Sequence, residues 1–219
     1  MIAVIDYEMG NVGSVLNMLK KLGVSAKLTG DPAELARASG LILPGVGAFD
    51  CGMQRLHERN LVGPLHDLVL GDRKPVLGIC LGMQLMANGS SEGSVPGLGW
   101  FDSQVQLFQR DPLQPQLRVP HMGWNFIHPT EPTDPLLAQL PPSPRYYFVH
   151  SYYYPAGIPH AVASTRHILP FTSVLARDNI RGCQFHPEKS HSFGLRLLKN
   201  FSHLALGRRD ETSLGTLPS

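Results

Sequence analysis

Residue types that together can hydrolyse an amide occur in two short stretches of this sequence. Cys80 lies between Gly78 and Gly82, directly after the apolar run 75–79. This is the thiol form of the G-x-S-x-G nucleophile elbow, in which small flanking residues permit a strained turn from a strand into a helix. At a helix start, free N–H groups and the helix dipole favour the thiolate, which is the nucleophilic form. The pattern predicts that Cys80 is a nucleophile rather than a buried structural residue.

A thiolate nucleophile needs a base that later protonates the leaving group, and His186 is placed to serve as one. It ends the apolar run 180–185, and Glu188 follows two residues later. If this strand and the Cys80 strand are neighbours in a parallel sheet, both side chains emerge at its carboxyl edge, where open α/β sheets bind ligands. Glu188 would then orient the imidazole as the third member of a triad.

The run Pro44-Gly45-Val46-Gly47 follows another short apolar strand and so belongs at the same edge. Its glycines let backbone N–H groups approach a tetrahedral oxyanion, together with the N–H of Leu81. Taken alone, such a run is more often only a turn.

The elements that must position these residues follow from hydrophobic periodicity. Short strands that are apolar on all sides alternate with amphipathic helices, which predicts an α/β fold with a mixed, mostly parallel sheet between two helix layers. Asp31, Pro32 and Glu34 predict a helix start with a capping box. The expected strands are 2–5, 26–29, 41–43, 76–79, 146–149 and 180–185, and two of the expected helices are 12–22 and 192–206.

Proline becomes frequent after residue 100, which favours loops and shorter antiparallel strands. We expect one domain over residues 1–206, followed by a loose polar tail at 207–219.

Composition excludes several function classes. The net charge is only +2, with no basic cluster interleaved with aromatic residues, so nothing favours nucleic-acid binding. No apolar run is long enough to span a bilayer, and no secretory signal is evident. Three irregularly spaced cysteines fit a reducing cytoplasm, and Cys51 and Cys183 are interpreted as buried structural residues. No residue cluster has metal-ligand spacing, and cysteine catalysis needs no organic cofactor.

The combined motifs resemble those of the triad-type (class I) glutamine amidotransferases, which have a flavodoxin-like three-layer fold. Within that group the sequence is similar to the glutaminase subunits of imidazole glycerol phosphate synthases, from residue 1 to about residue 206. The motifs that carry the resemblance are Pro44-Gly45-Val46-Gly47, Gly78-Ile79-Cys80-Leu81-Gly82-Met83-Gln84, Gln184-Phe185-His186-Pro187-Glu188-Lys189-Ser190, Asp6-Tyr7 with Gly10-Asn11, Pro120-His121-Met122-Gly123-Trp124-Asn125, and Tyr147-Phe148-Val149-His150-Ser151-Tyr152.

The resemblance implies roles for these residues. Cys80 would attack the carboxamide of glutamine, His186 would shuttle the proton, and Glu188 would orient His186. By the same resemblance, Gln84, Glu92 and Ser151 would bind glutamine, and Val46 and Gly47 would lie on a strand that flips to complete the oxyanion hole. Asn11, Trp124, Tyr147 and Lys189 would face a partner around the ammonia exit; apart from the family, they would be a helix cap, two core aromatics and a solvated lysine.

The resemblance also implies the partner, a separate (β/α)₈ cyclase subunit that receives ammonia through its barrel. The reaction there makes imidazole glycerol phosphate and an aminoimidazole carboxamide ribotide in histidine biosynthesis. The expected assembly is a cytoplasmic heterodimer with low glutaminase activity until the partner is loaded.

Two departures from the family pattern keep a second interpretation open. Residues 165–171 lack the usual Tyr-Gly pair, and Ser90-Ser91-Glu92 has a serine where the first acid is expected. Paralogues of this subunit supply ammonia to sugar amidotransferases of surface-polysaccharide pathways, and stretches 97–100 and 189–194 resemble theirs. Two further classes differ in their expectations: a non-catalytic binding module would lack a triad member, and a cysteine peptidase would cleave peptides without a partner.

Overall fold

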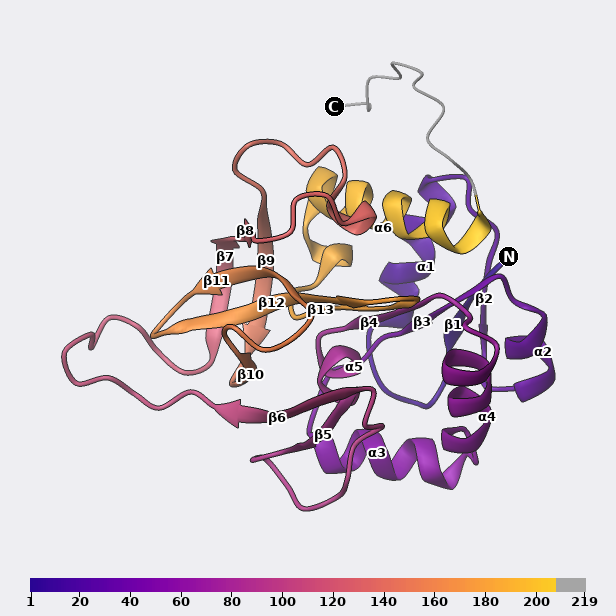
Figure 1. Ribbon diagram of the computed structural model, residues 1–219, viewed down its shortest axis with the longest axis horizontal. Helices are drawn as coiled ribbons and strands as arrows, with labels where there is room; N and C mark the ends of the chain where they lie inside the picture. Colours follow the sequence, from indigo (N-terminus) through magenta and orange to yellow (C-terminus); the bar gives the residue numbers. More distant parts are fainter. Residues whose placement is uncertain (208–219) are drawn as a thin grey trace.

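Five parallel strands form the part of the sheet that carries the elbow, in a computed structural model that describes residues 1–207 of the chain (Figure 1). Their order is β2 (Ala26–Thr29), β1 (Ile2–Ile5), β3 (Gly40–Leu43), β4 (Val76–Ile79) and β13 (Ile180–Cys183). Every residue of β1, β3, β4 and β13 is buried, whereas the edge strand β2 is largely not. Strands that are covered on both faces need apolar side chains on both faces. The parallel pairing of these buried strands confirms the sheet that the continuous apolar runs predicted.

Helices cover both faces of these strands, as Figure 1 shows. On one face, α1 and α6 pack against Ile2 and Val4; on the other, α2, α3 and α4 pack against Ala3 and Ile5. Successive residues of a strand point to opposite faces, so one four-residue strand supplies both cores. The helical segments are α1 (Val12–Lys21), α2 (Pro32–Arg37), α3 (Phe49–Glu58), α4 (Val62–His66), η1 (Asp67–Gly71), α5 (Leu81–Gln84), η2 (Pro135–Leu137), η3 (Pro187–Lys189) and α6 (His191–Leu206).

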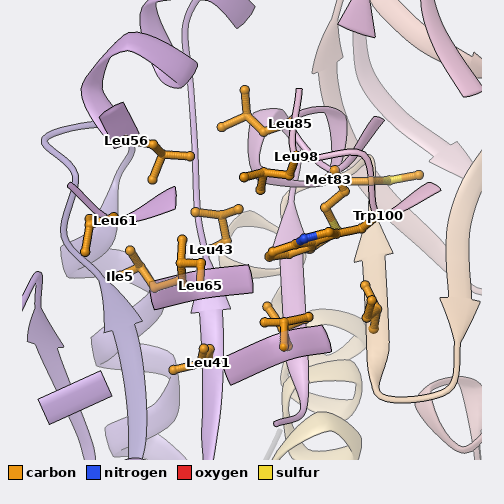
Figure 2. Close-up of a cluster of buried hydrophobic side chains, with 14 of the residues drawn as sticks. Ile5, Leu41, Leu43, Leu56, Leu61, Leu65, Met83, Leu85, Leu98 and Trp100 are labelled. Atoms are coloured by element: carbon orange, nitrogen blue, oxygen red, sulfur yellow. The ribbon is translucent and has the colours of Figure 1, made fainter. Parts of the chain in front are cut away.

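The side covered by α2, α3 and α4 has a core of closely packed leucine side chains (Figure 2). The cluster includes Leu41 and Leu43 of β3, Leu56 of α3 and Leu65 of α4, and Trp100 lies in it beside Met83. All five of the leucine and tryptophan side chains have no exposed area. This core fixes the strand ends that precede the elbow, since packed interiors resist displacement.

The second half of the sheet is mostly antiparallel, as the proline-rich region predicted. Beyond β13 the order is β12, β10, β6 and β5, and β11 with β8 branches from β12. The pair β5–β6 is parallel, so the region is mixed rather than wholly antiparallel. The bounds are β5 (Ala87–Ser90), β6 (Phe101–Leu107), β8 (His128–Pro129), β10 (Tyr152–Pro155), β11 (Ala161–Arg166) and β12 (Pro170–Arg177).

A separate antiparallel ribbon consists of β7 (His121–Phe126) and β9 (Arg145–His150). It joins the main sheet where the backbone N–H of His186 donates to the carbonyl of Tyr147 at 2.9 Å. The predicted strand 180–185 therefore ends earlier, at Cys183, because the next residues leave β13 toward this ribbon.

The expected helix after Cys80 is much shorter than its sequence indicates. α5 has four residues, and the chain then turns into β5, which pairs with β6 from Ala87 onward. A macrodipole sums over aligned peptide groups, so one turn contributes little of the predicted dipole effect at Cys80.

Two local predictions are wrong. Glu34 does not complete a capping box, because its carboxylate is drawn to Lys27 at 2.6 Å, although Asp31 does cap the N–H of Ala33. Cys51 is exposed on α3 rather than buried, whereas Cys183 is buried as expected.

Among the described residues, every helix is too short or too polar to cross a membrane. The predicted tail lies outside the described residues from position 208 onward.

Candidate active site

The elbow at Cys80 has the strained backbone that its glycines predict. Cys80 has φ 52° and ψ −109°, outside the regions that side chains with a Cβ prefer. A Cβ on Gly82 would lie 1.8 Å from the carbonyl oxygen of Leu43, and one on Gly78 would lie 2.7 Å from the N of Met83. Both positions are thus closed to larger residues, and the turn can present only the residue between them.

Cys80 and His186 meet at one edge of the sheet because their strands are parallel neighbours. Cys183 of β13 pairs with Ile79 of β4, and the N–H of Cys80 donates to the carbonyl of Cys183 at 2.8 Å. The exposed fraction is 6% for Cys80 and 1% for His186. The predicted juxtaposition at the carboxyl edge is confirmed.

His186 is held by a buried carboxylate. Its Nδ1 donates to Oε1 of Glu188 at 2.7 Å, and both side chains are almost fully buried. Burial by itself lowers the pKa of His186, but the neighbouring Cys80 sulfur and the Glu188 carboxylate outweigh it and raise the pKa to about 10. The imidazole therefore carries two protons at neutral pH. Its Nε2 makes no hydrogen bond of ordinary geometry within residues 1–207.

A cavity of about 280 Å³ opens over these side chains, a size suited to a single amino acid. The predicted nucleophile, base, oxyanion residues and glutamine-binding residues all line this cavity. Its lining consists of Val46, Gly47, Cys80, Leu81, Gln84, Glu92, Pro120, Val149, His150, Ser151, Tyr152 and His186.

One of the predicted oxyanion donors, the backbone N–H of Leu81, is already engaged. The N–H of Leu81 donates to the carbonyl of Gly45 at 3.3 Å. The loop is held from below by the buried Tyr7 hydroxyl, which donates to the carbonyl of Pro44. Gly47 has φ +113°, and Val46 is 40% exposed. Two N–H groups can converge on an oxyanion only after the loop moves relative to Leu81.

The three predicted glutamine-binding residues approach the cavity from different elements. Gln84 ends α5, and Glu92 follows β5, where its carboxylate accepts from the N–H of Phe49 at 2.8 Å. Ser151 lies between β9 and β10. Glu92 thereby also caps α3, whose own N-cap residue Ala48 provides no side-chain oxygen.

Three of the four predicted partner-facing residues cluster on the outer side of the β7–β9 ribbon. The rings of Trp124 and Tyr147 lie 6.3 Å apart, and Nζ of Lys189 lies 5.8 Å from the Tyr147 ring. Trp124 is 42% exposed, so it is not a core aromatic. Asn11 is the exposed N-cap position of α1, yet its side chain makes no capping hydrogen bond.

Sequence reasoning missed Gln184 and Val149, whose polar groups reach the sulfur. The Nε2 of Gln184 lies 3.7 Å from Sγ of Cys80, and the carbonyl of Val149 lies 3.9 Å away. The available signal was a glutamine within a wholly buried strand run, since buried amides need partners. His121 and His150 hydrogen-bond to each other at 3.0 Å.

Within residues 1–207, no group of histidine, cysteine or acidic side chains is arranged to hold a metal ion.

The fold and this site define a glutamine amidotransferase. Residues 3–204 match the family model described as glutamine amidotransferase class-I, and the chain belongs to that family. Among solved structures, a glutamine amidotransferase has a TM-score of 0.71 with 18% identity, over 94% of this chain and 99% of that one. Another, from Thermotoga maritima, has a TM-score of 0.62 with 16% identity, over 94% and 84%. These structures share the fold.

Closer relatives are curated as one particular subunit. The chain is 48% identical to imidazole glycerol phosphate synthase subunit HisH 2 of Pseudomonas aeruginosa, over 93% of this chain and all of the relative. It is 46% identical to the HisH 2 of Methanococcus maripaludis, over 92% and 98%. It is 44% identical to HisH of Bdellovibrio bacteriovorus, over 93% and 100%.

Proposed function

We propose that this chain is the glutaminase subunit of an imidazole glycerol phosphate synthase and works in the cytoplasm. The observation that carries the chemistry is one cavity lined by Cys80, His186, Gln84 and Glu92, with Glu188 hydrogen-bonded to His186. The names of the relatives supply the pathway, since they are curated as subunits of that synthase.

In the proposed reaction, Cys80 Sγ attacks the carboxamide carbon of glutamine and forms a tetrahedral oxyanion. His186 then gives its Nε2 proton to the leaving nitrogen, which departs as ammonia and leaves a thioester on Cys80. Water, deprotonated by His186, attacks the thioester and releases glutamate. Glu188 keeps the imidazole in the tautomer that leaves Nε2 toward the cavity.

The resting loop supports the proposal of partner control. The carbonyl of Gly45 accepts the hydrogen bond of the Leu81 N–H. This N–H can therefore stabilise an oxyanion only after residues 45–47 rearrange. Removing one oxyanion donor costs about 10²–10³-fold in kcat in comparable enzymes. Binding of the loaded partner would supply the free energy for that rearrangement.

The proposed partner is a cyclase subunit with a (β/α)₈ barrel, docked on the ribbon face beside Trp124, Tyr147 and Lys189 and on Asn11 at the start of α1. Trp124 and its exposed β7 neighbours Met122 and Phe126 give this face an apolar character. Lys189 adds an exposed charge beside the ring of Tyr147. Exposed apolar patches rimmed by charge are typical of protein interfaces.

The decisive experiment measures glutamate release from glutamine with and without the histidine-pathway cyclase subunit and its ribotide ligand. We expect strong stimulation only with the loaded cyclase, and none in Cys80→Ala. Cys51→Ala serves as the matched control because that cysteine is exposed and outside the cavity. A dead Cys80→Ala variant without cyclase stimulation would move the chain to the sugar-amidotransferase paralogues, and full activity of Cys80→Ala would reject the nucleophile.

A further inference from the structure

The side-chain amide of Gln184 lies directly beside the nucleophilic sulfur. Gln184 follows β13, has no exposed area, and places Nε2 3.7 Å from Cys80 Sγ. The carbonyl of Val149 also lies near the sulfur, at 3.9 Å, and it can only accept a hydrogen bond. A protonated thiol can donate to Val149, whereas a thiolate can accept from Gln184.

The orientation of the Gln184 amide follows from one backbone carbonyl. The atom of Gln84 that lies 3.0 Å from the carbonyl of Tyr152 must be the amide nitrogen, because a carbonyl only accepts. The same Nε2 lies 3.0 Å from the Gln184 amide, so the facing atom there is the acceptor Oε1. The Nε2 of Gln184 is left to face Cys80.

Two buried histidines secure that carbonyl from the other side. Nδ1 of His150 donates to Tyr152 O at 2.8 Å, so in a neutral ring Nε2 of His150 is an acceptor. It receives Nδ1–H of His121 at 3.0 Å, and Nε2 of His121 in turn receives the amide of Asn125 at 3.1 Å. Burial lowers the pKa of both rings, to about 2 for His121 and about 3 for His150, which agrees with neutral tautomers.

We propose that Gln184 is a further catalytic residue, whose amide N–H stabilises the Cys80 thiolate, while Gln84 and the His121–His150 pair hold that amide in its donating orientation. The inference rests on the proposed function, in which Cys80 is the nucleophile. Gln184 does not line the cavity, whereas Gln84 does. Gln184 therefore contacts the nucleophile directly, and it reaches the glutamine-binding residues only through Gln84.

A purely structural role makes different predictions. If the two amides only satisfy each other in the core, loss of Gln184 lowers stability and leaves the reactivity of Cys80 unchanged. If Gln184 stabilises the thiolate, reactivity falls toward any electrophile, including one that makes no contact with Gln84 or Glu92.

The test measures alkylation of Cys80 by iodoacetamide at neutral pH in a Cys51→Ser background, because the exposed Cys51 would also react. We expect Gln184→Met to lower the rate constant about tenfold, the effect of losing one hydrogen bond to a charged group. The ultraviolet absorbance of the thiolate should decrease in parallel. Ser173→Ala is the matched control: its buried hydroxyl has no partner within residues 1–207, while its carbonyl accepts from the Gln184 backbone.

Turnover in the complex with the cyclase gives a second readout. We expect Gln184→Met to lower kcat about tenfold with KM changed by less than about twofold. Unchanged alkylation and kcat in a folded Gln184→Met variant would overturn the proposal. If the cyclase never stimulates glutaminase activity but alkylation still depends on Gln184, the proposed function fails and this inference stands.

A measurement on the unaltered residue covers the case in which Gln184→Met does not fold. In ¹⁵N-labelled protein, the side-chain amide proton of Gln184 should move to a different chemical shift when Cys80 is replaced by Ala. A resonance that stays in place would show that the amide makes no bond to the sulfur, and would overturn the proposal.

Discussion

Two buried histidine sites in this protein differ in charge: His186 is protonated, whereas His121 and His150 are neutral. His186 and the His121–His150 pair are buried to a similar extent, with 1%, 4% and 6% of their surface exposed. The pKa of His186 is raised to about 10, because Cys80 and Glu188 outweigh its burial. The pKa of His121 is lowered to about 2, because burial is joined by the charge of neighbouring histidines. Burial thus disfavours the charged form of each imidazole, and a neighbouring negative charge, present only at His186, restores it.

The largest expected effect comes from removing the charged histidine. His186→Ala should lower glutaminase kcat about 10⁴-fold or more, since it removes both the base and the proton donor. The check is glutamate release by the complex at saturating glutamine. A loss smaller than about a hundredfold would mean that another group moves the proton.

Removing only the negative charge of Glu188, beside His186, tests the electrostatic part of this comparison. Glu188→Gln preserves shape but takes away the carboxylate that bonds Nδ1 of His186. We expect kcat to fall roughly 10²–10⁴-fold, because the imidazole loses the group that fixes its tautomer and stabilises its charge.

The same substitution has a signature in stability. With a folded pKa of about 10 against 6.5 unfolded, His186 contributes stability that is complete below pH 6.5 and is lost as pH rises toward 10. Urea unfolding of Glu188→Gln should show a shallower alkaline decline than wild type, and an identical decline would contradict the assignment.

The neutral His121–His150 pair should affect stability at acid pH, whereas His186 affects it at alkaline pH. Unfolded, His121 and His150 bind protons below about pH 6.5, whereas folded they do so only near pH 2 and 3, so acid favours the unfolded chain. Well below pH 6.5 each group changes the unfolding free energy by about 1.4 kcal/mol per pH unit, which gives about 2.5 kcal/mol for both at pH 5.5 relative to pH 7. Chemical unfolding of His121→Asn/His150→Asn should remove most of this acid loss; an equal loss in the double variant would contradict it.

The smallest effect is expected at an exposed histidine. His57 lies in the last turn of α3 and is exposed to solvent. His57→Gln should change the unfolding free energy by less than about 0.5 kcal/mol and leave kcat as in wild type. A larger change would show that residue type, and not burial with its partners, governs these sites.

Sequence alone predicted the charged site far better than the neutral one. Gly78, Cys80 and Gly82 report a local turn, and parallel pairing of two apolar strands brings His186 to the same edge. The His121–His150 contact depends on the register of the β7–β9 ribbon, where these residues are opposite each other across 29 positions of sequence. Long-range register leaves no local pattern to read.

The same distinction explains the errors. A capping box at Glu34 satisfied every local rule, but Lys27, in the neighbouring strand β2, competed for the carboxylate. The helix after Cys80 has the residues to continue, yet β6 offers the chain a strand partner from Ala87 onward. In each case a tertiary contact outweighed a local preference of about 1 kcal/mol or less.

The positive φ of Cys80 has a consequence for the evolution and engineering of this protein. A non-glycine residue at φ 52° and ψ −109° costs roughly 1–3 kcal/mol, which glycine would not incur. Selection for thermal tolerance alone would therefore favour glycine at the one position where chemistry requires a thiol. Stability-guided redesign of such subunits should hold this residue fixed, because here the gain in robustness and the loss of function arise from the same substitution.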